Sequence, residues 1–185
     1  MDKPQRKHPR LKFYDYSKNG YYYITICTHQ RLQILSQIVG RGLAPAAQYT
    51  DQSQFDDYSP CSIELSSLGQ IAENQLNDLP KRYPYIIIDR YVIMPDHIHI
   101  IMILQDMPGT AGASPRPTKS SVSDIICAYK SLVTRKCNEI DDTPGRKIFQ
   151  TSFYEHIIRN EESYLEICKY IYDNPIKRYY DNQEE

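Results

Sequence analysis

The chain has 185 residues, 41% of them hydrophobic, and a formal net charge of −1 at pH 7. This length and composition predict one domain with a substantial core. The charge is unusual for a protein that handles a polyphosphate backbone, so nucleic-acid binding would depend on where the cations lie. The 5 cysteines form no Cys-x-x-Cys pair and the 7 glycines form no phosphate-binding loop, which argues against a disulfide framework and a bound nucleotide. Without an apolar signal region or a membrane-spanning stretch, we expect a cytoplasmic protein that has no membrane partner.

A basic segment opens the chain. Residues 1–12 contain four candidate DNA contacts, Arg6, Lys7, Arg10 and Lys12. Such an arm either follows a DNA backbone or is an ordinary solvated terminus, and the sequence leaves both interpretations open.

The segments that follow alternate between strand-like and helix-like patterns. Tyr21 to Thr28 is rich in β-branched and aromatic residues and predicts a strand. Residues 34–62 have no sustained periodicity and predict a long surface insertion. Residues 67–79 predict a helix that ends at Pro80.

Two histidines lie within a strongly apolar strand. Residues 85–89 and 91–104 predict paired strands, and the second is apolar on both faces, which places it near the centre of a sheet. Side chains two residues apart on a strand leave the same face, so His97 and His99 together could hold one divalent cation. A structural histidine pair is the alternative, since histidine is tolerated at half-buried strand positions.

A second long helix is predicted at residues 122–138, after a flexible connection at about 106–120. Lys130 and Arg135 on this helix could line a DNA path, although a solvated helix face is the default interpretation. The extended segment that follows contains His156 and Arg159. Arg159 could hold a phosphate, or both residues could have a structural role beside the next helix.

The C-terminal pattern predicts a helix from Asn160, a good N-cap, to Asn174, because Pro175 disfavours further propagation. Its apolar stripe would pack on the sheet and consists of Tyr164, Ile167, Cys168 and Ile171. Tyr170 and Asn174, four residues apart, project together beside this stripe. Tyr172 lies on another side of the helix.

Three motifs together resemble one protein family. They are MPDHIH at residues 94–99, FYEHIIRN at 153–160 and YIYDNP at 170–175. They resemble the IS200-like single-tyrosine transposases of the HUH nuclease superfamily, and among these the REP-associated tyrosine transposases. The resemblance extends over nearly the whole chain, from residue 13 to residue 177.

The resemblance implies a role for each matching residue. It makes Tyr170 the nucleophile, and it makes His97, His99 and Asn174 the ligands of Mg²⁺ or Mn²⁺. It implies cleavage and strand transfer of single-stranded DNA at REP- or BIME-like hairpins through a 5′-phosphotyrosine link. A tyrosine hydroxyl is a poor nucleophile at neutral pH, and the cation would stabilise the charge that forms at phosphorus. Lys177, three residues after Asn174, could reach the phosphates of the strand.

The resemblance and the order of elements both imply an α+β, ferredoxin- or RRM-like sandwich. Its antiparallel sheet would have four or five strands, with helices on one face and a C-terminal helix that carries the tyrosine. We expect a domain at 13–178 and a tail at 179–185, in a nucleoid-associated bacterial protein. The histidines and the tyrosine would meet within a monomer or across a homodimer, and the sequence does not decide between these.

The chain departs from the family pattern at Phe149-Gln150-Thr151, where relatives usually carry Trp-Gln-Arg. The missing arginine removes one backbone contact but leaves the implied catalytic set intact. A separate alternative hypothesis is a non-catalytic, RRM-like nucleic-acid-binding protein in which the histidines are structural. A small metallohydrolase is a weaker one, because no set of Asp and Glu ligands accompanies the histidines.

Overall fold

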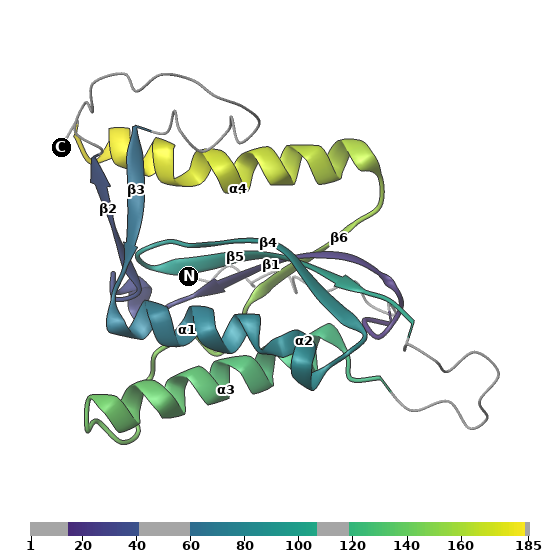
Figure 1. The fold of residues 1–185 in the computed structure, drawn as a ribbon, viewed down its shortest axis with the longest axis horizontal. Helices are drawn as coiled ribbons and strands as arrows, with labels where there is room; N and C mark the ends of the chain where they lie inside the picture. Colours follow the sequence, from purple (N-terminus) through teal and green to yellow (C-terminus); the bar gives the residue numbers. More distant parts are fainter. Residues whose placement is uncertain (1–14, 41–59, 107–118, 184–185) are drawn as a thin grey trace, which may run out of the picture.

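A four-stranded antiparallel sheet forms the centre of the protein (Figure 1). The computed structural model describes residues 15–40, 60–106 and 119–183. The strand order is β4-β5-β1-β6, and the strands are β1 (Gly20–Cys27), β4 (Ile86–Ile93), β5 (His97–Leu104) and β6 (Tyr154–Ile158). The strand predicted at the sheet centre is confirmed, because β5 lies between β1 and β4.

Two long helices cover one face of this sheet (Figure 1). They are α1 (Ser67–Asn77) and α3 (Val122–Ile140), and the short helix α2 (Leu79–Arg82) follows α1. Strand residues that alternate in sequence face them: Ile24 of β1 and Ile98 and Ile100 of β5 are fully buried in this core. The order β1, α1, β4, β5, α3, β6 is that of the ferredoxin-like fold, so the predicted fold class is confirmed.

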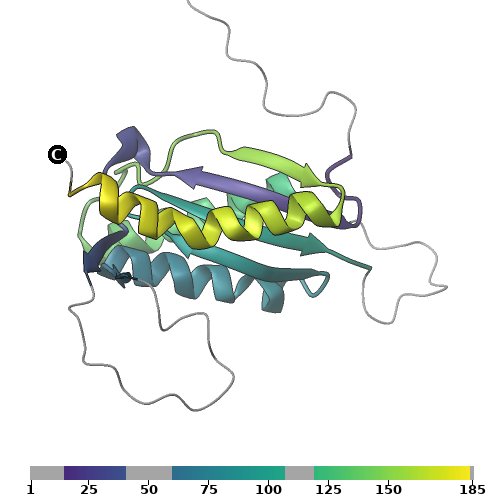
Figure 2. The ribbon, with the colours of Figure 1, turned by 90° about the horizontal axis from the view of Figure 1, so that it is seen from above.

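The C-terminal helix α4 (Glu161–Asp181) covers the opposite face and runs lengthwise over the sheet (Figure 2). Asn160 accepts a hydrogen bond from the backbone N–H of Ser163 and caps the helix as predicted. The predicted apolar stripe packs on the sheet, with Ile171 buried against Val92 and Ile101. This second, smaller core lies next to the histidines.

Helix α4 does not end at Asn174, and this prediction was wrong. Pro175 lies inside the helix, which continues to Asp181 and takes up the start of the expected tail. A proline removes one backbone hydrogen bond, but the last turns pack against a neighbouring element. A Cβ atom placed on Gly40 would lie 2.5 Å from the hydroxyl oxygen of Tyr179, which shows how closely the helix approaches that element.

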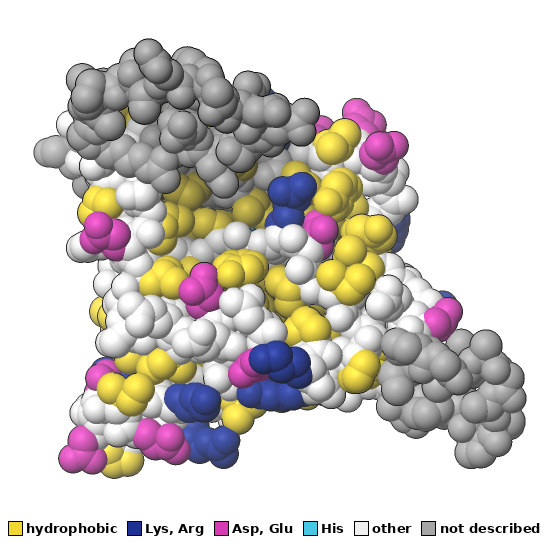
Figure 3. Space-filling model, viewed as in Figure 1, with side chains coloured by type: hydrophobic (Ala, Val, Ile, Leu, Met, Phe, Trp, Pro, Cys, Tyr) yellow, Lys and Arg dark blue, Asp and Glu magenta, His cyan; other side chains and the backbone are white. Residues whose placement is uncertain are grey.

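That element is a two-stranded antiparallel ribbon of β2 (Ser36–Gly40) and β3 (Cys61–Leu65). The ribbon stands upright between the sheet layer and α4 (Figure 1). The insertion predicted at 34–62 therefore contains a strand and the start of another, while residues 41–59 lie outside the described residues. Hydrophobic side chains line the hollow between the ribbon, the β4 edge and α4 (Figure 3).

Strand boundaries also differ from the prediction around Asp89. The expected break between residues 89 and 91 is a β-bulge between Ile88 and Arg90, and β4 continues to Ile93. The turn falls at Pro95 instead, which cannot donate to the ladder. Helix 67–79 breaks at Asp78, and Pro80 lies inside α2.

Some predictions concern residues that are not described. The basic arm, including Arg6, Lys7, Arg10 and Lys12, lies outside the described residues, as does most of the connection at 106–120. Among the helices of the described ranges, none combines the length and apolarity that a membrane crossing requires.

Candidate active site

Strand β5 presents both histidines to the face of the sheet that α4 covers. His97 and His99 pair with Cys27 and Thr25 of β1, and their ring centroids lie 4.5 Å apart. His99 is only 3% exposed. The predicted placement of the two imidazoles on one face is therefore confirmed.

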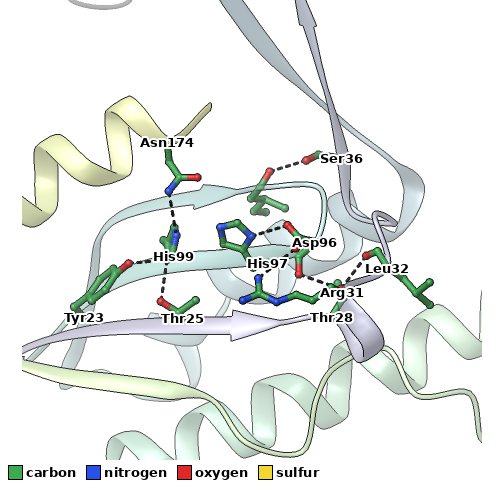
Figure 4. Close-up of polar contacts among 11 residues, drawn as sticks. Tyr23, Thr25, Thr28, Arg31, Leu32, Ser36, Asp96, His97, His99 and Asn174 are labelled. Carbon is green, nitrogen blue, oxygen red and sulfur yellow. Dashed lines mark hydrogen bonds and ion pairs between the residues drawn. The ribbon is translucent and has the colours of Figure 1, made fainter. Parts of the chain in front are cut away.

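Two hydroxyl groups fix the ring of His99 (Figure 4). Its Nδ1 lies 2.8 Å from Tyr23 Oη and 2.9 Å from Thr25 Oγ1. Burial, followed by the neighbouring His97, lowers the pKa of His99 to about 3, so the ring is neutral at physiological pH. When Nδ1–H donates to these hydroxyls, the lone pair of Nε2 is left to bind a cation.

The carboxylate of Asp96 fixes the ring of His97. Asp96 Oδ1 lies 2.7 Å from His97 Nδ1, and Asp96 Oδ2 accepts a hydrogen bond from Arg31 Nη1 at 3.2 Å (Figure 4). Burial lowers the pKa of His97, while Asp96 opposes this shift. The pairing with Asp96 favours the tautomer with its proton on Nδ1, which again leaves Nε2 free.

Helix α4 brings the predicted tyrosine and amide to the same place. Asn174 reaches from the helix towards His99, with Nδ2 3.5 Å from His99 Nε2 (Figure 4). The ring centroid of Tyr170 lies 5.2 Å from that of His99, and the Tyr170 side chain is 51% exposed. All four residues come from one chain.

The four residues line a cavity of about 770 Å³ between α4 and the sheet. Of the predicted DNA contacts in the described residues, only Lys177 lines this cavity. Arg31 and Arg178 line it too, and the sequence analysis missed both. It also missed the role of Asp96, although a carboxylate next to a candidate ligand histidine is a usable signal.

The remaining predicted contacts lie elsewhere. Lys130 is largely buried and donates from Nζ to the carbonyl oxygens of Gln150 and Thr151, at 2.6 and 2.8 Å. Its cation is thereby engaged within the protein, and it lines a cavity with Arg135 that does not contain the histidines. Arg135 lies on α3, across the sheet from the histidines, within reach of Glu139.

His156 and Arg159 are exposed at the β6 edge and line a different cavity from the histidines. Tyr172, an exposed tyrosine two residues after Tyr170, lines the hollow beside the ribbon. Its place in a different cavity from the histidines agrees with its predicted place on another side of the helix.

The donor set fits a divalent cation. His97 and His99 each have Nδ1 engaged and Nε2 available, and rotation of the Asn174 amide exchanges Nδ2 for Oδ1 at the same position. Two imidazole nitrogens and one amide oxygen leave positions open for phosphate oxygens. The described ranges contain no group of three or more His, Cys, Asp and Glu that could bind a metal, and the Asn174 amide is the third donor of this set.

Comparisons with known proteins bear on this site. No family model matches the chain. It is 32% identical over 184 residues to an uncharacterized protein of Haemophilus influenzae, covering 92% of this chain and 88% of that protein. It is also similar to the solved structure of a REP-associated tyrosine transposase bound to a REP hairpin, with a TM-score of 0.57 and 21% identity, covering 91% of this chain and 74% of that one. The resemblance seen in the sequence motifs is thus confirmed at the level of the fold.

Proposed function

We propose that this chain, which belongs to one family with the Haemophilus influenzae protein and has the fold of the REP-associated tyrosine transposase, is a metal-dependent single-stranded DNA endonuclease and strand transferase. One observation carries the proposal. An exposed tyrosine and three potential metal ligands, His97, His99 and Asn174, line one cavity of one chain.

Tyr170 is the nucleophile in this proposal. Its hydroxyl oxygen attacks a DNA phosphorus, the bond from phosphorus to the 3′ oxygen breaks, and the products are a 5′-phosphotyrosine and a strand with a free 3′-OH. The proton lost from the phenol balances the proton gained by the leaving oxygen. Each step exchanges one phosphodiester for another, so no nucleotide cofactor is needed.

The neighbouring Tyr23 is a poor alternative nucleophile. It is only 9% exposed, and burial raises the pKa of its hydroxyl above the ordinary value. The same hydroxyl lies at His99 Nδ1. Tyr23 therefore orients a ligand, whereas Tyr170 is accessible to a strand in the cavity.

The ligand residues have a shared task. His97, His99 and Asn174 would hold Mg²⁺ or Mn²⁺ through the two Nε2 atoms and the amide oxygen. A bound cation supplies Lewis-acid polarisation of the phosphate. The two hydroxyls at His99 and the carboxylate at His97 keep the imidazoles in the required orientation.

The proposed substrate is single-stranded DNA next to a hairpin. Attack by Tyr170 requires a phosphate that can be drawn into the cavity between α4 and the sheet, which a stacked duplex would resist. The solved transposase of the same fold is bound to a REP hairpin, which supports a hairpin of that kind as the partner. A monomer suffices for the chemistry, because one chain provides every proposed group.

The test is adduct formation with labelled hairpin oligonucleotides. Wild-type protein with Mn²⁺ or Mg²⁺ should give a covalent protein–DNA species on a denaturing gel, EDTA should remove it, and mass spectrometry should map it to Tyr170. Tyr170→Phe should bind DNA and form no adduct, and His97→Ala should lose cleavage while remaining folded.

Tyr172→Phe is the matched control. It removes one exposed hydroxyl from the same helix, 43% exposed against 51% for Tyr170, but from a different cavity. It should leave the adduct yield unchanged. An adduct that survives in Tyr170→Phe would refute the proposal, and DNA binding that ignores EDTA and gives no adduct would favour the non-catalytic alternative.

A further inference from the structure

The turn that follows β1 has an unusual backbone. Gln30 and Arg31 have φ angles of 54° and 57°. These angles lie in the left-handed region of backbone conformation, which residues other than glycine rarely adopt. Two consecutive left-handed residues are energetically unfavourable. The surrounding structure must compensate for this cost, and such strain often accompanies a functional requirement.

A buried threonine holds this turn against the turn before β5. Thr28 is fully buried, and its hydroxyl lies 2.8 Å from the carbonyl oxygen of Leu32 and 3.0 Å from that of Asp96. Its backbone N–H donates to the same Asp96 carbonyl at 2.9 Å. The turn is therefore fixed relative to the histidine strand, and its conformation aims the Arg31 side chain at the cavity.

Asp96 connects Arg31 to the candidate metal site. One carboxylate oxygen lies at His97 and the other accepts from Arg31 Nη1, with the side chain of Arg31 54% exposed. A guanidinium has five N–H donors, and the contact with Asp96 engages one of them. The remaining donors are available to an anion in the cavity that Arg31 lines.

A second guanidinium lines the same cavity from α4. Arg178 lies in the turns of α4 that follow Pro175, as does Lys177. The continuation of the helix beyond Pro175 thus brings cations to the cavity wall. Two carboxylates, Glu166 and Asp181, also line the cavity. Glu166 lies one helical turn before Tyr170, away from the end of the helix that carries Arg178.

We propose that Arg31 and Arg178 bind the backbone phosphate next to the scissile one, with Asp96 holding Arg31 in position. The inference rests on the proposed function and adds the residues that fix the strand on the His97 side of the cavity. Both residues bind DNA and neither takes part in the chemical step. Guanidinium groups suit this task because they contact phosphate oxygens in pairs.

The test measures binding of an oligothymidine to proteins that carry Tyr170→Phe, so that no covalent product forms. Arg31→Gln and Arg178→Gln should each weaken binding about tenfold at low salt. Each should also lower the slope of log K against log salt concentration, by at most about 0.7, because that is the value for one phosphate contact on a single strand and the two arginines share one phosphate. Arg31→Lys should keep the slope, because it keeps the charge.

Two further variants separate binding from folding. Arg31→Gly removes the guanidinium at a φ angle that glycine adopts freely, so it should weaken binding without lowering the thermal unfolding midpoint. Lys81→Gln is the matched control, because it removes an exposed cation that pairs with Asp78 on the far side of the sheet. It should change neither the affinity nor the slope.

The outcomes distinguish this inference from the proposed function. If wild-type protein forms the Tyr170 adduct but the variants at Arg31 and Arg178 bind with unchanged affinity and slope, the phosphate site is refuted and the function stands. If the variants bind oligothymidine more weakly and with a smaller salt dependence, while wild-type protein gives no adduct with hairpins, the phosphate site stands and the proposed function is refuted.

Discussion

The carboxylate of Asp96 should control how tightly the site binds a divalent cation. Its Oδ1 lies 2.7 Å from His97 Nδ1, a short, charge-assisted contact. In Asp96→Asn an amide oxygen can still accept from Nδ1–H, but the bond becomes neutral. A neutral hydrogen bond contributes about 1 kcal/mol and one to a charged group about 1.5–3 kcal/mol. A loss of about 1.4 kcal/mol corresponds to a tenfold weaker affinity for Mn²⁺.

Isothermal titration of Mn²⁺ into the metal-free protein measures this change directly. Asp96→Ala removes the acceptor altogether and should weaken Mn²⁺ further, towards the hundredfold limit seen for partners of ligand histidines. Glu73→Gln is the control, because Glu73 also accepts a hydrogen bond, from Tyr91 Oη at 3.0 Å, but outside the cavity. Equal Mn²⁺ affinities in wild type, Asp96→Asn and Asp96→Ala would refute the assigned role.

Three other variants test the structure around the site. Tyr23→Phe removes one of two hydroxyls at His99 Nδ1, so Mn²⁺ titration should show a few-fold weaker affinity, a loss of about 0.5–1 kcal/mol, with the DNA adduct retained. A wild-type adduct that mass spectrometry maps to Tyr23 would refute this role. Gly69→Ala should lower the free energy of unfolding, measured in urea, by about 1–3 kcal/mol or more, because the new Cβ would lie 1.9 Å from the carbonyl oxygen of Leu35. An unchanged midpoint of urea unfolding would contradict this packing. Lys130→Met keeps the aliphatic stem of the side chain but leaves the carbonyl oxygens of Gln150 and Thr151 without their donor. The free energy of unfolding in urea should therefore fall by about 1–3 kcal/mol. A variant as stable as wild type would show that these two hydrogen bonds do not stabilise the protein.

The groups that meet in the candidate site could be predicted where one element fixes them. His97 and His99 share a face because a strand repeats every two residues, and Tyr170 and Asn174 share a flank because they are one helical turn apart. These rules depend only on local geometry. The motif resemblance then linked the strand and the helix, which no local rule could do.

The partners of these groups could not be predicted, because they depend on contacts between distant segments. Arg31 and Asp96 are 65 residues apart and meet only because Thr28 joins two turns. The end of α4 was predicted wrongly for the same reason, since packing against the ribbon outweighs the local effect of Pro175. Strand β2 was missed because a strand of 5 residues is defined by its partner and not by its own pattern.

Helix α4 is held near both of its ends. Tyr164 donates to Asp89 near the first turn, and Tyr179 lies against Gly40 near the last. Tyr170 and Asn174 lie between these two anchors, one turn apart on the same continuous helix. The nucleophile and the amide ligand are therefore present or withdrawn together. Under the proposed function, a DNA end joined to Tyr170 stays over its own sheet, and a second strand must come to it for the exchange to proceed.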